Sequence, residues 1–590
     1  MKKIALLLTV FACSGLLQAK TLYLAPNENW KKDGARFAIY TFGNGEGWYS
    51  MSAVNGASGF YQATIDDKYP QVIFCRMNPA TSENNWGNKW NQTSDLTLEI
   101  GKDLYTIAEG AWDKGAGTWS VYGGGDTPGG DDPVTPSDYS SAVPSECEDV
   151  MLQAFYWSSY NDNTYGGTRW ATLTSKADEI NANFDIVWLS PSGRGDGMGY
   201  IPKVYSNQNN SMGSSITLTN LINALHAGGT KVLADVVINH AGNKSSWVDF
   251  EEQNFDEYGK FQPVSTWITS DDEAKGHGTL GSNADDGQES NRNYGSARDW
   301  DHKNENVQKM CRAYLKWLKN VIGYDGFRFD YCGGYHVSHI NDYVSAAKPY
   351  FSVMEYWNGN ATVLSTRIVE ASRNTLTFDF AEFYTAFQQG IAVNNYSKLI
   401  KPGLRGVGAG YTKYAVTFVD NHDTFNRSDI GNTDCGNSKD GKTSLANKEL
   451  ILQCNAYLLS MPGVPCVFYP HWYTYKDEIN AMIHARKSAG VHSESKVESE
   501  TSGSGWYKAT VVGKAGKVIL YLGSAASEAA PEGYKQAVKS NKVAMYYTGD
   551  ETRGLDEVEN KEHGTKFIQD GQLLIRAGEK VYDAQGRLIR

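Results

Sequence analysis

Residues 324–330 read YDGFRFD, and this stretch decides the fold. Its apolar residues are typical of a buried β-strand, yet the strand ends in the carboxylate of Asp330, two residues after Arg328. Asp and Asn often follow strands simply because they begin turns. The role of a single such carboxylate can therefore be predicted only from its sequence context. A carboxylate at the edge of a core is nevertheless costly unless it is paired or takes part in chemistry.

The same pattern recurs along the chain. Polar groups also end three other apolar runs, VLADVVINH (232–240), YFSVMEYW (350–357) and AVTFVDNHD (415–423). Four further β-rich runs complete a set of eight: MLQAFYW (151–157), DIVWLS (185–190), TLTFDF (375–380) and GVPCVFY (463–469). Stretches with helical periodicity lie between them, at 218–229, 307–323, 449–461 and 478–490.

Eight strand–helix units in sequence predict an α/β fold, a (β/α)8 or TIM barrel over residues 145–490. Such barrels place their active site at the carboxyl ends of the strands. Asp330, Glu355 and Asp423 each stand at such an end. These three carboxylates are therefore the candidate catalytic residues.

Taken in this order, the segments resemble the alpha-amylase family of glycoside hydrolases. The resemblance covers roughly residues 148–545, and the stretches FVDNHDT (418–424) and MPGVPCVFYPHW (461–472) are most similar to plant-type alpha-amylases. It implies hydrolysis of internal α-1,4-glucosidic bonds in starch and related glucans, with retention of anomeric configuration.

A retaining glycosidase uses an ionised carboxylate as nucleophile and a protonated carboxyl as acid, about 5–5.5 Å apart. The resemblance implies that Asp330 is the nucleophile, that Glu355 is the acid/base, and that Asp423 stabilises the oxocarbenium-like transition state. Arg328, which stands beside Asp330 and is counted among the candidate substrate-binding residues, is expected to keep the pKa of Asp330 low. The apolar neighbours of Glu355 are expected to raise its pKa.

The resemblance also implies a sugar-binding cleft. His240 and His422 match histidines that hydrogen-bond the sugar, although a lone histidine more often has a structural role. Aromatic planes stack on the apolar face of glucose, and the matching residues are Tyr200, Trp157 and Trp357. Core packing is an equal alternative for Trp157.

One position departs from the family pattern. Where the family usually has a lysine three residues after the nucleophile, this chain has Gly333. A contact to the leaving group is therefore expected to be missing, while the catalytic carboxylates are unchanged.

Residues 241–302 separate the third strand from the next barrel helix, and their length predicts a small inserted domain. The stretch is rich in Asp, Asn, Gly and Ser, whose oxygens suit calcium. The resemblance assigns Asn239, Asp285, Asp299 and the backbone carbonyl of Gly334 to a site for Ca2+. A solvated acidic loop remains the alternative for Asp285.

A Gly/Pro/Asp-rich stretch, GGGDTPGGDDPVTPSD (123–138), predicts a linker over residues 123–144. Residues 20–122 before it alternate short strands with turns, which predicts a β-sandwich module. WYSM (48–51) and NNWGNKWNQT (84–93) resemble starch-binding modules of bacterial amylases. The candidate sugar-binding residues are Trp48, Trp86, Trp90 and Gln92, with core packing an equal alternative for any one tryptophan.

The two ends of the chain are typical of targeting segments. Residues 1–19 carry two lysines, a short apolar stretch and Ala19 as a cleavage point, which predicts a secretory signal peptide and a secreted or cell-surface bacterial protein. Lipidation at Cys13 is the weaker alternative. Residues 491–548 alternate as strands of an antiparallel C-terminal domain, and the tail at 549–590 resembles sorting segments of secreted bacterial proteins.

The net charge of −12, without a basic cluster, argues against nucleic acid and anionic membranes as partners. No segment after the signal is long and apolar enough to predict a transmembrane helix. Seven scattered cysteines remain after the signal, and they are typical of buried thiols rather than a disulfide framework. The expected partner is starch or another neutral α-glucan, and the expected state is a monomer.

Two other functions stay open. A non-catalytic glycan-binding protein on a degenerate amylase scaffold would be expected to lack a catalytic carboxylate, and all three are present. A transglycosylase or branching enzyme would share the same three carboxylates, because its choice of acceptor depends on loops.

Overall fold

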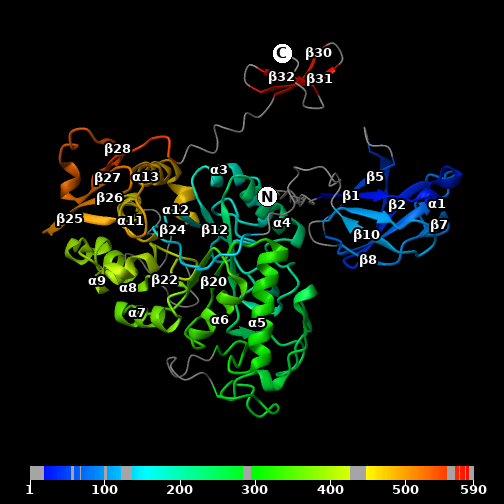
Figure 1. Ribbon diagram of the computed structural model, residues 1–590, viewed down its shortest axis with the longest axis horizontal. Helices are drawn as coiled ribbons and strands as arrows, with labels where there is room; N and C mark the ends of the chain where they lie inside the picture. The colour runs from blue at the N-terminus through cyan, green and yellow to red at the C-terminus, as the bar shows by residue number, and fades with distance from the viewer. Residues whose placement is uncertain are drawn as a thin grey trace, which may run out of the picture. The chain divides into compact units, whose positions relative to one another are not determined.

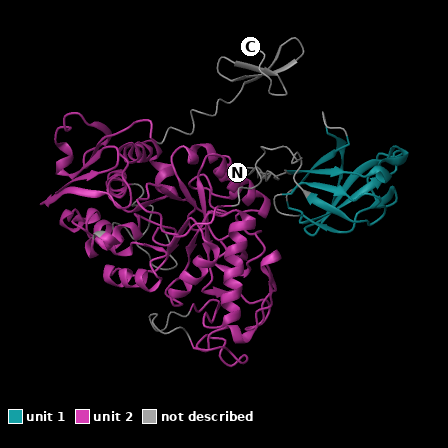
Figure 2. Cartoon of the chain, in the orientation of Figure 1, with its two compact units in different colours: residues 1–132 teal, residues 133–590 magenta. Residues whose placement is uncertain are grey.

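The computed structural model describes residues 19–54, 59–66, 68–98, 102–120, 136–283, 294–425, 447–553, 565–569, 572–577 and 580–583. The chain divides into two compact units, residues 1–132 and 133–590, which Figure 2 colours separately.

Eight parallel strands close a barrel in the larger unit (Figure 1). In order around the barrel they are β11 (Met151–Gln153), β12 (Ile186–Trp188), β15 (Lys231–Val236), β20 (Gly326–Phe329), β21 (Phe351–Met354), β22 (Leu376–Phe378), β23 (Ala415–Phe418) and β24 (Val464–Phe468). The last strand returns to the first, with Met151 opposite Cys466. Each strand overlaps one of the eight predicted runs, so the (β/α)8 barrel is confirmed.

Helices lie between these strands in the sequence and also follow the last of them. The four predicted helical stretches form α4 (Ser215–Ala227), α5 (Glu305–Trp317), α11 (Lys448–Ser460) and α13 (Lys476–Ala489). The others are α2 (Trp170–Thr174), α3 (Ala177–Asn181), α6 (Ser338–Ala347), α7 (Ala361–Glu370), α8 (Phe380–Glu382), α9 (Gly403–Val407) and α12 (Tyr469–Thr474). Side chains cap several N termini, as where Ser214 accepts a hydrogen bond from the amide of Thr217.

Two insertions after barrel strands border the carboxyl ends. The first is the hairpin β13 (Arg194–Asp196) and β14 (Ile201–Val204), between β12 and α4. The second contains β16 (His240–Ala241), β17 (Gln253–Asn254), β18 (Lys260–Phe261) and β19 (Arg298–Asp299). Because His240 pairs with Asp299, the start and end of this insertion meet beside the barrel.

An antiparallel sheet follows the barrel, as predicted. Its strands are ordered β25 (Lys496–Gly503), β26 (Trp506–Val512), β27 (Lys517–Gly523), β29 (Val543–Thr548) and β28 (Lys535–Lys539). This sheet contacts α11 and α13 of the barrel.

The smaller unit is the predicted β-sandwich. One sheet is ordered β10 (Gly117–Ser120), β9 (Leu104–Ile107), β1 (Ala19–Ala25), β5 (Tyr61–Asp66) and β4 (Ser52–Ala53). The other is ordered β3 (Gly47–Ser50), β2 (Arg36–Phe42), β6 (Gln71–Met77) and β7 (Lys89–Gln92), with β8 (Leu96–Thr97) also paired to β6. Alternate residues of both sheets fill the core between them, including Leu24, Phe37, Ile39, Phe74 and Tyr105.

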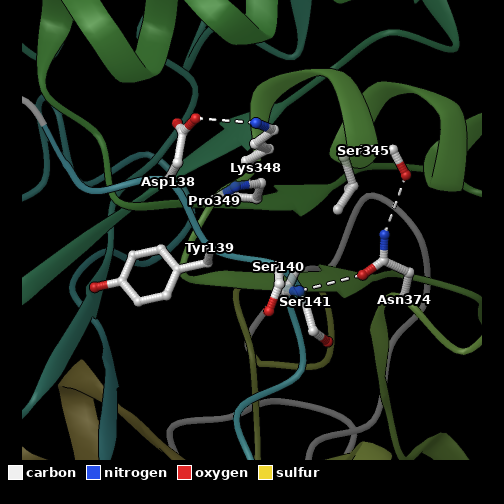
Figure 3. A pocket seen from close by; sticks show the side chains of 10 residues that line it. Asp138, Tyr139, Ser140, Ser141, Ser345, Lys348, Pro349 and Asn374 are labelled. Carbon is white, nitrogen blue, oxygen red and sulfur yellow. Dashed lines mark hydrogen bonds and ion pairs between the residues drawn. The ribbon is translucent and has the colours of Figure 1, made fainter.

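The segment 136–142 packs against the amino-terminal ends of the barrel strands (Figure 3). Asp138 pairs with Lys319 and Lys348, and the amide of Ser352 on β21 donates to the carbonyl of Ala142. The segment borders a cavity of about 410 Å³, at the end of the barrel opposite the predicted catalytic carboxylates. The linker predicted over 123–144 therefore differs from the structure, because its last residues belong to the barrel unit.

Three smaller findings complete the fold. A separate antiparallel sheet contains β30 (Thr565–Gln569), β31 (Gln572–Ala577) and β32 (Lys580–Asp583). All six cysteines in the described ranges are buried free thiols, as predicted. A search of the described residues finds no helix with both the length and the apolar character needed to cross a membrane.

Candidate active site

Arg328 gathers three carboxylates inside the barrel. Its Nη1 donates to Asp235 Oδ1 and to Asp330 Oδ1, both at 2.7 Å, and its Nη2 lies 2.8 Å from Glu355 Oε1. The guanidinium has no exposed surface. Two of the three predicted catalytic carboxylates, Asp330 and Glu355, therefore meet at one buried cation.

Strand geometry explains this meeting. Arg328 and Asp330 are two residues apart, so their side chains leave the chain on the same side. Asp235 on β15 pairs with Arg328 on β20, and Glu355 directly follows the adjacent strand β21. Parallel pairing of three neighbouring strands thus aligns the four groups at one level of the barrel.

The cluster has three carboxylates for one guanidinium. Burial raises the pKa of Asp235 to about 6, that of Asp330 to about 7 and that of Glu355 to about 8, with Arg328 opposing each rise. The charge of Asp423 adds to the rise at Asp330 and Glu355. Glu355 is therefore the carboxyl that best retains a proton at neutral pH, as predicted.

The low pKa predicted for Asp330 is wrong. The prediction considered the neighbouring Arg328 alone, whereas the structure shares this cation among three buried carboxylates. Desolvation then outweighs the attraction of the guanidinium.

The turn after β20 links the two carboxylates. Tyr331 has a φ of +48°, which is uncommon for a residue with a side chain and places its amide toward Glu355. This amide donates to Glu355 Oε2 at 3.0 Å, and the amide of Cys332 donates to the Glu355 carbonyl. The backbone after the predicted nucleophile therefore fixes the position of the predicted acid.

Asp423 lies in a tight turn after β23. Asn421 Oδ1 accepts hydrogen bonds from the amides of Asp423 and Thr424, both at 2.8 Å. Asp420 at the base of the turn accepts from the Thr424 hydroxyl, and its other oxygen lies 3.2 Å from His471 Nε2. His471 is fully buried and comes from α12, so a neighbouring barrel element supports this turn.

Three rings stack beside the carboxylates. The Tyr200 ring lies parallel to that of His422, with centroids 5.1 Å apart, and Trp157 stacks near both. The Tyr200 hydroxyl donates to Asp235 at 2.7 Å. Gln153 donates to His422 Nδ1, which leaves Nε2 of the neutral ring to carry its proton, 3.5 Å from Asp423.

His240 and Trp357 are the two remaining predicted sugar-binding residues of the barrel. His240 Nε2 contacts the carbonyl of Tyr200 at 2.8 Å, and burial lowers the pKa of His240 to about 4. Its ring is therefore neutral, and its contact with sugar remains a prediction. Trp357 stacks on Phe380 and donates from Nε1 to the Tyr384 hydroxyl, leaving the ring half-buried.

Three of the four predicted metal ligands meet where the inserted domain joins the barrel. Asn239 Nδ2 donates to Asp299 Oδ1 at 3.1 Å, and both residues are buried. A Cβ on Gly334 would lie 1.9 Å from Asn239 Oδ1, so only glycine fits against this amide. Burial raises the pKa of Asp299 to about 8. The fourth residue, Asp285, lies outside the described residues.

Sequence reasoning missed several contributors to this site. Asp235 lies within the apolar run VLADVV, and a carboxylate in mid-strand is itself a signal that chemistry or pairing holds it. Gln153 is likewise a polar residue in an apolar run, at the end of β11. The roles of Tyr331 and His471 have no comparable signal, because they depend on a backbone angle and on packing between distant segments.

Comparison with known proteins decides the family. The family of the alpha-amylase catalytic domain matches residues 155–365. Glucan 1,4-alpha-maltotetraohydrolase of Stutzerimonas stutzeri is 30% identical over 404 residues, which cover 64% of this chain and 68% of that protein. The chain belongs to the alpha-amylase family. In this alpha-amylase homologue the three predicted catalytic carboxylates, Asp330, Glu355 and Asp423, all follow the carboxyl ends of barrel strands.

One further relative and one solved structure are also similar to this chain. Chloroplastic alpha-amylase 3 of Arabidopsis thaliana is 29% identical over 390 residues, 62% of this chain, and the chain spans only 40% of that protein's length. The crystal structure of a cyclomaltodextrin glucanotransferase with a three-domain ABC distribution gives a TM-score of 0.50 at 14% identity, over 68% of this chain and 99% of that one. At this identity the likeness concerns the fold alone.

In the smaller unit of this alpha-amylase homologue, the four predicted sugar-binding residues do not form one site. Trp48 and Trp86 form an aromatic cluster with Tyr40, with ring centroids 4.7–5.0 Å apart. Trp90 instead lies over the guanidinium of Arg76. Gln92 is buried, and its side chain accepts a hydrogen bond from Lys89.

Proposed function

We propose that this protein is a secreted alpha-amylase that hydrolyses internal α-1,4-glucosidic bonds of starch-like glucans with retention. The observation that carries the proposal is the shared contact of Asp330 and Glu355 with buried Arg328, beside the stacked rings of Tyr200 and His422. Family membership supports the reaction class.

In the first step, an Asp330 oxygen attacks the anomeric carbon while Glu355 protonates the departing glycosidic oxygen. The bond to the leaving sugar breaks, and a glycosyl ester forms on Asp330. Glu355, now ionised, then takes a proton from water, and the resulting oxygen attacks the same carbon and frees Asp330. The high pKa of Glu355 favours its role as acid in the first step.

Arg328 and Asp423 support this sequence electrostatically. Arg328 contacts Asp330 in both steps, so it stabilises the carboxylate whenever Asp330 is ionised. Asp423 is partly exposed beside the buried pair and offers negative charge to the positive character that develops on the sugar.

We also infer a calcium ion at the junction of the inserted domain. The residue types fit: Asn239 offers an amide oxygen, Asp299 a buried carboxylate, and Gly334, whose Cα lies against the Asn239 side chain, a backbone carbonyl. A bound ion would join two segments of the native state and stabilise it by mass action. Metal analysis of purified protein, with melting temperatures in EDTA, tests this inference.

The smaller unit is proposed to bind starch through the cluster of Tyr40, Trp48 and Trp86. The Trp86 side chain is 46% exposed although it packs against two other rings. Exposed indoles suit the apolar face of glucose. The N-terminal segment, read as a secretory signal, supports export of the whole protein.

Product analysis on soluble amylose tests the catalytic proposal. Hydrolysis predicts shorter chains with one new reducing end per cleavage, whereas transfer predicts new linkages without a rise in reducing ends. A wide spread of early products supports attack at internal bonds, while accumulation of maltotetraose alone would favour attack from chain ends. Unchanged amylose would contradict the proposal.

A further inference from the structure

Two exposed tryptophans of the sandwich lie away from the cluster of Tyr40, Trp48 and Trp86. Trp90 on β7 is 39% exposed, and Trp112 after β9 is 42% exposed. Both indoles lie over the guanidinium of Arg76, with distances of 4.7 and 5.1 Å from its central carbon to the ring centroids. We call these three residues the Arg76 cluster.

The pairing register places the two clusters on opposite faces of one sheet. Tyr40 on β2 lies opposite Trp48 on β3, so their rings share a face. Arg76 on β6 lies opposite Phe37, whose ring points the other way, into the core between the sheets. The Arg76 cluster therefore borders the inner face at the end of the sheet, and the Tyr40 cluster covers the outer face.

Arg76 is held rigidly. Its Nε donates to the Trp30 carbonyl at 2.9 Å, and its Nη2 donates to the Lys32 carbonyl at 2.6 Å and to Asp33 at 2.8 Å. The side chain is only 3% exposed. A fixed cation that contacts two indoles holds both rings in place, so they would lose little freedom on binding a ligand.

The chemistry around the rings suits a neutral sugar chain. One face of each indole contacts Arg76, yet about two fifths of each side chain remains open. Asp33 beside them is 70% exposed and offers hydrogen-bond acceptors to hydroxyl groups. An indole plane with polar groups at its rim is the arrangement that binds the apolar face and the hydroxyls of glucose together.

We propose that the Arg76 cluster is a second α-glucan-binding surface, which acts together with the Tyr40 cluster on the opposite face of the sheet. The inference rests on the proposed function of the smaller unit as a starch-binding module. Two surfaces on opposite faces hold two chains, or two parts of one granule, at once. Loss of either surface then weakens adsorption to granular starch by up to about 10²- to 10⁴-fold, because the second contact is intramolecular.

Hydroxyl-radical footprinting of the full chain tests the proposal without altering the surface. The Glu355→Gln background keeps the glucan intact, and mass spectrometry measures oxidation of each tryptophan with and without maltoheptaose. The proposal predicts at least twofold protection of Trp90 and Trp112 as well as Trp86. Trp247, 44% exposed in the barrel unit, is the control and keeps its oxidation rate. Cellohexaose, with β-1,4 linkages, should protect these residues less.

The outcomes separate the two proposals. Protection of Trp86 without protection of Trp90 and Trp112 would overturn the second surface and leave the starch-binding module standing. Unchanged oxidation of all three would overturn both. Trp112→Ala and Trp86→Ala in the same background should each reduce adsorption to granular starch, whereas Trp247→Ala should not. Melting curves show whether each variant is folded. If Trp112→Ala is unstable, footprinting of the protein with its tryptophans unchanged decides whether the second surface binds glucan.

Discussion

Two buried arginines of the barrel unit meet carboxylates in opposite ways. Arg405 donates twice to Glu500 of the C-terminal sheet, at 2.9 and 2.8 Å, and also to Tyr457 and the Leu399 carbonyl. Glu500 accepts a further bond from the Tyr507 hydroxyl. Arg328 instead divides its contacts among three carboxylates. Arg405 thus directly contacts one carboxylate, although its charge also opposes the rise that burial causes in the pKa of Asp379 and Glu382. Arg328 directly contacts three.

We expect this difference in direct contacts to separate a structural ion pair from a catalytic one. Around Arg405, each carboxylate oxygen of Glu500 has a donor, so the pair joins the sheet to the barrel without chemistry. Around Arg328, burial raises the pKa of Asp330 and Glu355, so a proton stays close to a carboxylate that can attack. We expect the first cluster to contribute mainly to stability and the second mainly to turnover.

The largest expected effect is that of Asp330→Asn. The amide keeps the shape of the side chain but cannot form the glycosyl ester, so kcat on starch should fall roughly 10⁴-fold or more. Steady-state assays measure the loss, and retained binding of maltoheptaose is the control. Substantial hydrolysis by the purified variant would remove Asp330 from the role of nucleophile.

Glu355→Gln should lower kcat on starch about 10²- to 10⁴-fold, because the departing oxygen then lacks a proton donor. Aryl maltosides with good leaving groups should lose much less. In the unaltered enzyme, kcat/KM should fall as pH rises through about 8, since the acid must be protonated to act. Equal losses on both substrates would contradict the role of Glu355 as acid. The same would follow if kcat/KM of Glu355→Gln still fell as pH rises through about 8.

Glu355→Gln also tests how the stability of the fold depends on pH. The folded pKa of Glu355 is raised, so above the unfolded pKa the native state holds a proton that the unfolded state has lost. Stability should therefore fall as pH rises from about 4.5 toward 8, and Glu355→Gln should weaken this dependence. Melting temperatures of both proteins across this range give the comparison.

Arg405→Ala should destabilise the fold by about 3–5 kcal/mol, because Glu500 is left buried without its cation. Activity per folded molecule should remain near that of the unaltered enzyme. Lys517→Ala is the matched control, since its ion pair with Glu498 is exposed to solvent and should contribute little to stability. Urea unfolding measures both. Equal stabilities of the two variants would contradict the structural role of Arg405.

The smallest expected effect concerns His471, which supports the turn of Asp423 through Asp420. His471→Ala should lower kcat about tenfold with little change in KM, because the third carboxylate is less well positioned. His471→Gln, which keeps a donor, should recover part of the loss. A loss of stability alone, with kcat unchanged in the folded fraction, would show that His471 only packs.

Much of this comparison was visible in the sequence. The eight apolar runs predicted the barrel because strands buried on both faces read as continuous apolar segments, and the carboxylates stood out at their ends. The pKa of Asp330 could not be predicted, because Asp235 comes from a strand about 95 positions away and shares Arg328 only in the folded barrel. In the sandwich, the faces occupied by Trp86 and Trp90 could not be predicted from their spacing of four residues. The pairing of β6 with β7 shifts register between Arg76 and Met77, and this shift helps decide which face of the sheet each tryptophan occupies.

Trapping of the covalent intermediate tests the central claim most directly. A 5-fluoro-α-maltosyl fluoride should form a stable glycosyl ester with the enzyme, and peptide mass spectrometry should locate it. The account predicts one adduct per chain, on the peptide that contains Asp330, and none in Asp330→Asn. An adduct on Asp235 or Asp423, or turnover of the reagent without any covalent species, would contradict the assignment of Asp330 as the nucleophile paired with Glu355.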